Sequence, residues 1–344
     1  MSPFGAVRWT WIYPKADVPR GDMVGYRANG LSVNSTGYIV AGEVIHKSGK
    51  ANPLILLTDT EGESPNLFSV TLPSAAGNTG LSAQAAAEVG DDEILVLGSV
   101  EGLPETMILA KINTATPTSP VVAWDWAYEG GNSTVINKLF VDGNQNVTIG
   151  GTVTRNNFSD FRLIRAVQNF QGAGFDIPYG DPELNERANG ICKTANGFAM
   201  IGSTNVDGKT DRDILFTRVS ETGAVLSTRT YPVYFPGTEI PVNLDEEGNG
   251  ICTTSDGGFI ILATITSTTS EGNVLGRGEK DYYLMKINAF GDVEWSRAFG
   301  SRRDDVGVSV SQADDGGYVI LGYTKLANVE TIALIKTNEF GEIE

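Results

Sequence analysis

The chain has 344 residues, of which 41% are hydrophobic and 19% charged, and its formal net charge is −17. This composition is typical of a soluble globular protein, and the acidic balance argues against nucleic-acid binding and against charge-driven binding to anionic membranes. No apolar run reaches the ~18–20 residues of a membrane span, and the opening MSPFGAVRW lacks the basic and apolar regions of a signal peptide.

Six segments that end in Gly or Ala recur along the chain and define a repeat. They are YIVAG, ILVLG, NVTIG, FAMIG, FIILA and YVILG, which end at Gly42, Gly98, Gly150, Gly202, Ala263 and Gly322. Each is expected to be the second strand of a repeat, with a first strand of the GLSVN type before it and third (LILLTD) and fourth (VEWSRAF) strands after it. The segment SAQAAAEV (82–89) occupies the place of a first strand, so we expect a strand there rather than a helix.

Four-stranded units repeated every ~40–60 residues are the blades of a β-propeller. The sequence therefore predicts an all-β, six-bladed β-propeller of four-stranded antiparallel blades, forming a single domain over residues 1–344. The blades are expected at about 29–73, 79–128, 133–180, 188–233, 249–299 and 306–344.

The sixth repeat ends after its third strand, which leaves its blade one strand short. The segment VRWTWIY (7–13) is similar to VAWDWAY (122–128), the fourth strand of the second repeat. We expect residues 7–13 to complete the last blade and to close the ring, which removes an exposed sheet edge.

The two C-terminal repeats carry a family resemblance. DDGGYVILGYT with TIALIKTNEFGEIE, and SDGGFIILATITS with DYYLMKINAFGDVEWSRAFG, resemble the repeats of bacterial (Bacteroidota-type) cell-surface β-propeller proteins, which are common as lipoproteins. The resemblance implies a propeller fold, export, and a location at the cell surface or in the periplasm. It implies no activity.

Function is expected on the face that carries the long loops, which join the second strand to the third and each repeat to the next. Residues expected to line the central channel mouth there are Arg27, Asn29, Arg187, Asn189, Glu247, Asn249 and Asp304. Arg27 and Arg187 fall in opposite blades of a six-fold ring and would bind an anion such as a carboxylate, sulfate or phosphate. Alternatively, each arginine pairs with a nearby acid such as Asp22 or Glu186.

Aromatic residues near the same face offer a second type of contact. Tyr26, Tyr179, Tyr234 and Phe235 would stack on sugars or fill pockets of a partner protein. The alternative is that they close the ends of the blades.

Acidic or amide residues precede every third strand, at Asn52, Glu105, Asp160, Asp213, Asp281 and Glu330. Their recurrence in all repeats favours hairpin capping over a single metal or catalytic site. A calcium loop would have the oxygen-rich spacing seen at Asn205, Asp207, Asp211 and Asp213. The Glu and the helices of an EF-hand are missing, so a surface loop is favoured. The sequence indicates no other cofactor.

Basic residues recur within the third strands, at Lys111, Arg165, Arg218, Lys286 and Lys336. We expect them to pair with acids or to reach the surface along their aliphatic stems.

The two cysteines, Cys192 and Cys252, both follow Asn-Gly-Ile. Alignment of the repeats places Ser32, Ser82, Ile136 and Ser309 at the same position, after glycines Gly30, Gly80, Gly190, Gly250 and Gly307. We expect two free, buried and unreactive thiols, and glycines that permit a tight entry into the strand.

Support for catalysis is slight, because His46 is the only histidine and the sequence has no G-x-S-x-G or H-E-x-x-H motif. Three functions remain open. The favoured one is a non-catalytic binding or scaffold propeller with a protein or glycan ligand. The others are an accessory lipoprotein of an outer-membrane import or secretion complex, and a carboxylate-based glycan hydrolase or lyase. A hydrolase predicts a pocket with two acids and a strongly raised pKa.

Overall fold

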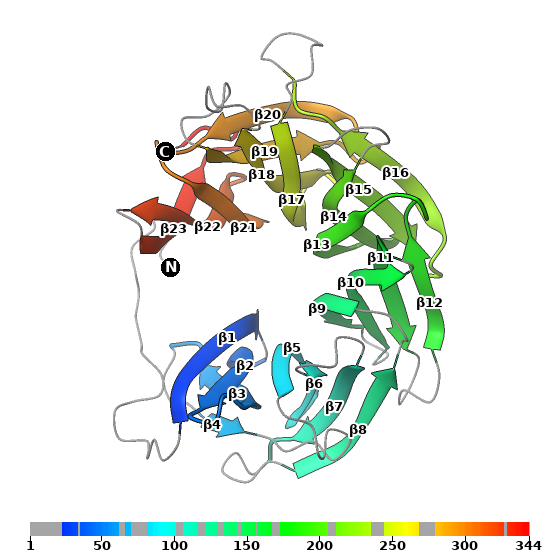
Figure 1. Ribbon diagram of the computed structural model, residues 1–344, viewed down its shortest axis with the longest axis vertical. Coiled ribbons are helices and arrows are strands. Elements are labelled where there is room, and N and C mark those ends of the chain that lie inside the picture. The colour runs from blue at the N-terminus through cyan, green and yellow to red at the C-terminus, as the bar shows by residue number, and fades with distance from the viewer. Residues whose placement is uncertain are drawn as a thin grey trace. The chain divides into compact units, whose positions relative to one another are not determined.

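The computed structural model describes residues 23–33, 35–61, 66–69, 81–100, 106–115, 121–129, 134–142, 146–155, 157–166, 173–205, 211–234, 244–267, 279–326 and 329–343. Every regular element in these ranges is a β-strand (Figure 1). Within the same ranges no helix has the length and apolar character needed to cross a bilayer. The segment 7–13, expected to close the ring, lies outside the described residues.

The strands form antiparallel sheets whose members follow one another along the chain. The first two sheets are β1 (Met23–Val33), β2 (Gly37–His46), β3 (Ala51–Asp59) and β4 (Asn66–Ser69), then β5 (Leu81–Gly90), β6 (Glu93–Val100), β7 (Thr106–Asn113) and β8 (Val121–Glu129). The third sheet is β9 (Thr134–Val141), β10 (Val147–Arg155), β11 (Phe158–Ala166) and β12 (Ala173–Tyr179). The strand expected at 82–89 is therefore confirmed as β5.

Three further sheets complete the described chain. They are β13 (Glu186–Thr194), β14 (Gly197–Asn205), β15 (Arg212–Ser220) and β16 (Val225–Tyr231), then β17 (Leu244–Thr253), β18 (Phe259–Ser267), β19 (Lys280–Ile287) and β20 (Val293–Phe299), and last β21 (Asp305–Gln312), β22 (Tyr318–Leu326) and β23 (Val329–Thr337). Among the described residues the last sheet has three strands, as its repeat predicts.

The chain divides into two compact units. Unit 1 is Met1–Ile149 with Ile164–Gly174, and unit 2 is Gly150–Leu163 with Phe175–Glu344. In unit 1 the core lies between successive sheets, with Ile39 and Ile55 packed against Ile94 and Ile108. In unit 2, Phe216 of β15 packs edge-on against Phe259 of β18, with ring centroids 5.3 Å apart. In both units, successive sheets thus bury apolar faces against each other.

Short hairpin turns close one end of the sheets. In the turn after β19, the Asn288 N–H donates to Asp292 O (2.9 Å) and the Gly291 N–H to Asn288 O (3.0 Å). Gly291 has φ +87°, a left-handed conformation that glycine adopts without steric cost. The Asn288 side-chain oxygen accepts the N–H groups of Phe290 and Asp292, which fixes the turn locally.

A β-bulge recurs in the first strand of five sheets. The register skips one residue at an equivalent place in each, and these residues are Asn29, Gln84, Asn189, Asn249 and Val308. A bulge inserts one unpaired residue and turns its side chain away from the ladder. The Asn of each Asn-Gly pair in these first strands is therefore a bulge residue.

The bulges join neighbouring first strands within each unit. Asn189 Nδ2 donates to Glu247 Oε1 (2.9 Å) and to Gly248 O (3.0 Å) on β17. The glycine that follows the bulge faces the backbone of the next strand: a Cβ on Gly250 would lie 3.1 Å from Ser309 Cα. The Asn-Gly pair thus supplies a hydrogen bond between strands and the space that lets them approach.

The paired register corrects our alignment of the repeats. Cys192 pairs with Ala199 and Cys252 pairs with Ile260. Each partner lies three residues before the Gly or Ala that ends the repeated segment of the second strand. By the same count, that position is Ala87 rather than Ser82 in the second sheet and Ser311 rather than Ser309 in the last. The sequence alignment missed these offsets because the bulges at Gln84 and Val308 lack the Asn-Gly pair that marks the bulge in other first strands.

Two sheets carry an apolar face that is exposed where other sheets are buried. Ile332 of β23 is 80% exposed, whereas Tyr282 at the same position of β19 is 2% exposed. In the first sheet, Leu31 is 67% exposed, whereas Ile251 at the same position of β17 is 8% exposed. Among the described residues of its own unit, each of these faces lacks the neighbour that its equivalents have.

The close approach of first strands gives a stability prediction. A Cβ on Gly30 would overlap the backbone oxygen of Gln84, whereas one on Gly90 would meet only the flexible Glu93 side chain, at 3.3 Å. We expect Gly30→Ala to lower the free energy of unfolding by about 1–3 kcal/mol, because the next strand must move away. Gly90→Ala is the matched control, with an expected change within about 0.5 kcal/mol in urea unfolding. Equal effects of the two exchanges would contradict the close contact.

Candidate functional site

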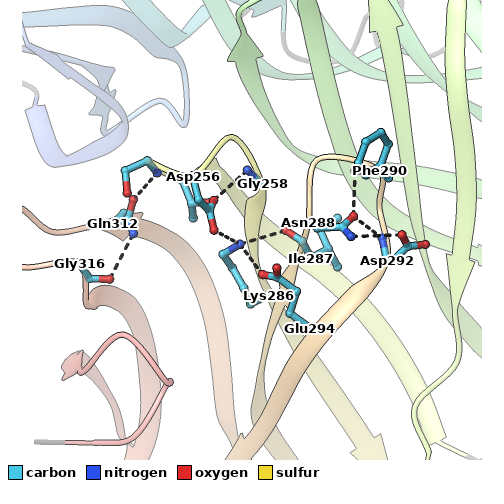
Figure 2. Close-up of polar contacts among 12 residues, drawn as sticks. Asp256, Gly258, Lys286, Ile287, Asn288, Phe290, Asp292, Glu294, Gln312 and Gly316 are labelled. Atoms are coloured by element: carbon cyan, nitrogen blue, oxygen red, sulfur yellow. Dashed lines mark hydrogen bonds and ion pairs between the residues drawn. The ribbon is translucent and has the colours of Figure 1, made fainter.

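The basic residues of the third strands mostly hold the short-turn end of the sheets together. Lys286 is the clearest case (Figure 2): its Nζ lies 2.8 Å from Asp256 Oδ2 and 2.7 Å from Glu294 Oε2 and donates to Ile287 O. Burial opposes its charge, but the hydrogen bonds to Asp256 and Glu294 outweigh this and raise the pKa of Lys286. The three groups come from one sheet, so the contact is structural.

The same pairing recurs in other sheets, as the sequence predicts. The ion pairs are Lys111–Glu93 (2.7 Å), Arg165–Asp142 (2.7 Å) and Lys336–Asp315 (2.8 Å). Arg218 differs, because its Nη1 donates to Ala289 O (2.6 Å) and its guanidinium lies over the Phe259 ring.

Residues expected at the channel mouth make local contacts in the structure. Arg27 Nη1 donates to Glu43 Oε1 (2.5 Å), its partner across the β1–β2 ladder. Asp22, the partner suggested by the sequence, lies outside the described residues. Arg187 is exposed and forms no ion pair within the described ranges. Arg27 belongs to unit 1 and Arg187 to unit 2, so their opposed placement stays a prediction.

The remaining members of this set lie at the bulges or beside them. Asn29 Nδ2 donates to Ser82 Oγ (2.8 Å) and Ala83 O (3.0 Å), and Asn249 Oδ1 accepts from Thr264 Oγ1 (2.7 Å). Glu247 accepts the amide of Asn189. These side chains link strands, which leaves ligand binding by them a prediction.

Asp304 was assigned to the channel mouth by the sequence alignment. In the observed pairing, Arg187 lies opposite Ser203, one residue after Gly202, and Val306 lies opposite Tyr323, one residue after Gly322. Val306 therefore occupies the position of Arg187 in the last sheet. Asp304 Oδ2 lies 3.7 Å from Lys325 Nζ, just ahead of β21.

The predicted aromatic residues divide into three cases. Tyr179 is buried at the end of β12, and its hydroxyl donates to Gly223 O (2.9 Å). Tyr234 is 46% exposed after β16. Phe235 and the side chain of Tyr26 lie outside the described part of the chain.

The proposed calcium loop is described only in part, because Asp207 lies outside the described residues. Asn205 ends β14 and pairs with Arg212 in the ladder, while Asp213 is buried in β15. Across the described ranges, no group of three or more acidic, His or Cys residues is arranged to hold a metal ion.

Unit 2 contains three pairs of buried carboxyl groups that the sequence did not reveal. Each joins the acid at the start of a third strand to an acid at the start of the following first strand, as Asp160–Glu186, Asp213–Glu246 and Asp281–Asp305. A Cβ on Gly300 would overlap Asp281 Oδ1 and lie 2.9 Å from Asp305 Oδ2, so the oxygens of that pair converge. The available signal was an acid three residues before the bulge, which is visible only once the bulge is located.

Burial and mutual repulsion change the protonation of two of these pairs. Desolvation, followed by repulsion from Asp160, raises the pKa of Glu186 to about 7. Desolvation and Asp213 raise the pKa of Glu246 to about 9. Two close carboxyl groups cannot both ionise cheaply, so each pair retains a proton near neutral pH.

A cavity of about 520 Å³ lies beside Glu186 in unit 2. Its apolar lining comes from Ile177 and Pro182 on one side and from Leu215 and Val225 of β15 and β16 on the other. Glu186 and Asp181 are its acidic groups, and the Asp181 N–H donates to Glu186 Oε2 (3.1 Å). Pro182 and Asp181 belong to the loop that joins β12 to β13, a type of loop in which the sequence predicts function. This cavity is the candidate site.

Both cysteines are free and half-buried rather than fully buried. Burial, with a further contribution from the neighbouring Cys252 thiol, raises the pKa of Cys192 to about 12. Because the thiolate is the reactive form, Cys192 is poorly suited to nucleophilic or redox chemistry.

Comparison with known proteins identifies the fold class. No family model and no curated protein matches the sequence. Three solved structures are similar: the subtype N11 neuraminidase-like protein of A/flat-faced bat/Peru (H18N11) (10% identity, 93% of this chain and 89% of that chain, TM-score 0.52), Chaetomium thermophilum Sqt1 (9%, 94% and 89%, 0.50), and a Dyadobacter fermentans protein of unknown function (10%, 90% and 94%, 0.50). These neighbours are β-propeller proteins. In its described residues, the chain is thus an all-β protein of six antiparallel sheets with a propeller-like fold.

The buried carboxyl pairs predict an unusual pH dependence. Because the pKa of Glu246 is about 9 in the folded state and 4.5 is its ordinary value, the folded state holds a proton that the unfolded chain releases. The contribution of Glu246 to stability is therefore fully present below about pH 4.5 and is lost as pH rises toward 9. We expect Glu246→Gln to remove this loss, on the order of 5 kcal/mol between pH 5 and 9.

Thermal unfolding from pH 5 to 9 measures the effect, with the exposed Glu183→Gln exchange as the matched control. A Glu246→Gln profile parallel to that of the wild type would show that Glu246 does not hold the proton.

Proposed function

We propose that this chain is a non-catalytic binding or scaffold protein of the β-propeller class, which takes a protein or glycan ligand on the face of its long loops. The cavity beside Glu186 carries the proposal, because it combines an apolar wall with two acids at a loop between successive sheets. Concave sites with a few fixed polar groups on a rigid scaffold are typical of ligand binding. One propeller neighbour, Sqt1, has been solved bound to the N-terminus of the ribosomal protein L10, so a similar fold accepts a protein segment.

The proposed location is the cell surface or the periplasm after export, on the strength of the family resemblance in the C-terminal repeats. An accessory role in an outer-membrane import or secretion complex is a variant of the same function. That variant predicts a broad contact face around the loops rather than a closed pocket.

A carboxylate-based hydrolase or lyase is the second candidate, favoured by one observation. Glu186 has a pKa of about 7 and lines the cavity with Asp181, and a general acid or base works best near the ambient pH. However, equivalent acid pairs recur at Asp213–Glu246 and Asp281–Asp305, which a single active site does not require. The recurrence supports binding over catalysis.

We further propose six blades closed by residues 7–13. The open apolar faces of the first and last sheets support closure, because Ile332 and Leu31 are exposed where their equivalents are buried. In β20, Trp295 lies 5.8 Å from the Tyr318 ring of the next sheet and covers Gly341. Trp9 takes the place of Trp295 when VRWTWIY is aligned with the fourth strands, and Tyr38 takes that of Tyr318.

The closure proposal predicts a large effect of the N-terminal strand on stability. Deletion of residues 1–13 should strongly lower Tm, and Trp9→Ala should cost about 1–3 kcal/mol, because the equivalent Trp295 is partly buried. Phe290→Ala is the control, because Phe290 is 76% exposed and its loss should change little. An unchanged Tm after the deletion would refute closure by this strand.

Ligand binding is tested on glycan and peptide arrays, alongside a pull-down from a native bacterial envelope. We expect a ligand whose binding is lost in Val225→Trp, which places a large ring at the cavity mouth on an exposed position. The Arg27→Ala/Arg187→Ala double variant tests the channel mouth instead. Loss only in the double variant would move the site there, and turnover of a glycan would favour the hydrolase.

A further inference from the structure

The charged side chains that line the cavity beside Glu186 are all acidic. Glu186 and Asp181 line it, Asp160 stands next to Glu186, and its described lining contains no lysine or arginine. Glu186 is 4% exposed as a whole residue, so water screens its charge poorly. A cation is the ligand that this electrostatic environment favours.

We infer that the cavity receives the side-chain ammonium of a lysine from a partner protein, with Glu186 as its acceptor. This inference rests on the proposed binding function and names the chemical group that is bound. The ammonium donates to the Glu186 carboxylate, and the aliphatic stem lies along the apolar wall.

The carboxyl pair explains why a cation binds better than a neutral group. At pH 7 the Asp160–Glu186 pair retains a proton in a large share of the molecules, because burial and repulsion raise the pKa of Glu186 to about 7. An incoming ammonium supplies the positive charge that this proton supplied, so both carboxyl groups can ionise. The proton leaves to solvent, and binding is therefore linked to proton release.

The shape and lining of the cavity favour a lysine over other cations. Ile177, Pro182, Leu215 and Val225 form an apolar wall that suits four methylene groups. Glu186 Oε2 already accepts the Asp181 N–H, which leaves less room for the two-pronged contact that a guanidinium prefers.

The surface at the cavity mouth favours a protein as the source of the lysine. Val225 and Leu226 begin β16 and are 56% and 51% exposed. β16 is the outer strand of its sheet, so its free edge offers backbone groups to a partner chain. An apolar patch beside a buried acid is complementary to a lysine that is flanked by apolar residues.

The experiment is calorimetric titration of the full chain with Nα-acetyl-lysine methylamide at pH 7. Nα-acetyl-norleucine methylamide, which lacks the amine, should bind at least tenfold more weakly, as should the arginine analogue and glucosamine. Glu186→Gln and Val225→Trp should each weaken lysine binding at least tenfold, while the matched Glu183→Gln should not. Titrations in buffers of different ionisation heats should show proton release in the wild type and none in Glu186→Gln.

Equal binding of the norleucine analogue would overturn the inference, because the ammonium would then contribute nothing. Glucosamine binding as tightly as the lysine analogue would overturn a protein source. If the Glu186→Gln variant does not fold, the Val225→Trp variant tests whether the cavity binds lysine, because Val225 is exposed and its exchange should not unfold the protein. Failure of the lysine analogue with retained array binding would refute this inference alone, whereas loss of both would refute the proposed function.

Discussion

The close approach of successive first strands is the constraint on which the rest of the structure depends. At Asn29–Gly30 and Asn189–Gly190 a bulge frees an amide to reach the next first strand, and the glycine leaves no side chain in the way. A larger residue would separate the strands and open the core between their sheets. We call this contact between successive first strands a seam. The loops outside a seam are free to differ in length, since they take no part in the contact.

The same seams in unit 2 hold polar groups that an apolar core would avoid. Buried carboxyl pairs reduce stability at high pH, yet they place an acid beneath each connecting loop. In one of the three seams the described structure also contains a cavity, which Glu186 lines. We regard the recurring pair as the structural background from which one member acquires a binding role.

Much of the fold is predictable from the sequence, because the repeat fixes strand order and turn positions. The pairing of Lys286 and Lys336 with acids also follows, since the same residue types recur at the same place. The pairing of Glu186 with Asp160 and of Glu246 with Asp213 was missed because a bulge shifts the register and leaves no uniform mark in the sequence. The cavity was missed because it depends on how two sheets pack, and Tyr179 proved buried because its hydroxyl bonds to the neighbouring turn.

The ion pairs of the short turns have a consequence for how such a chain can change over evolutionary time. Lys286, Asp256 and Glu294 belong to one sheet, so a duplication that copies the sheet copies a complete contact. The amide of Asn189 bonds to a different sheet, so its contact survives only when both copies keep compatible partners. Newly duplicated repeats would therefore inherit their turns intact and diverge chiefly in pairs across the seams.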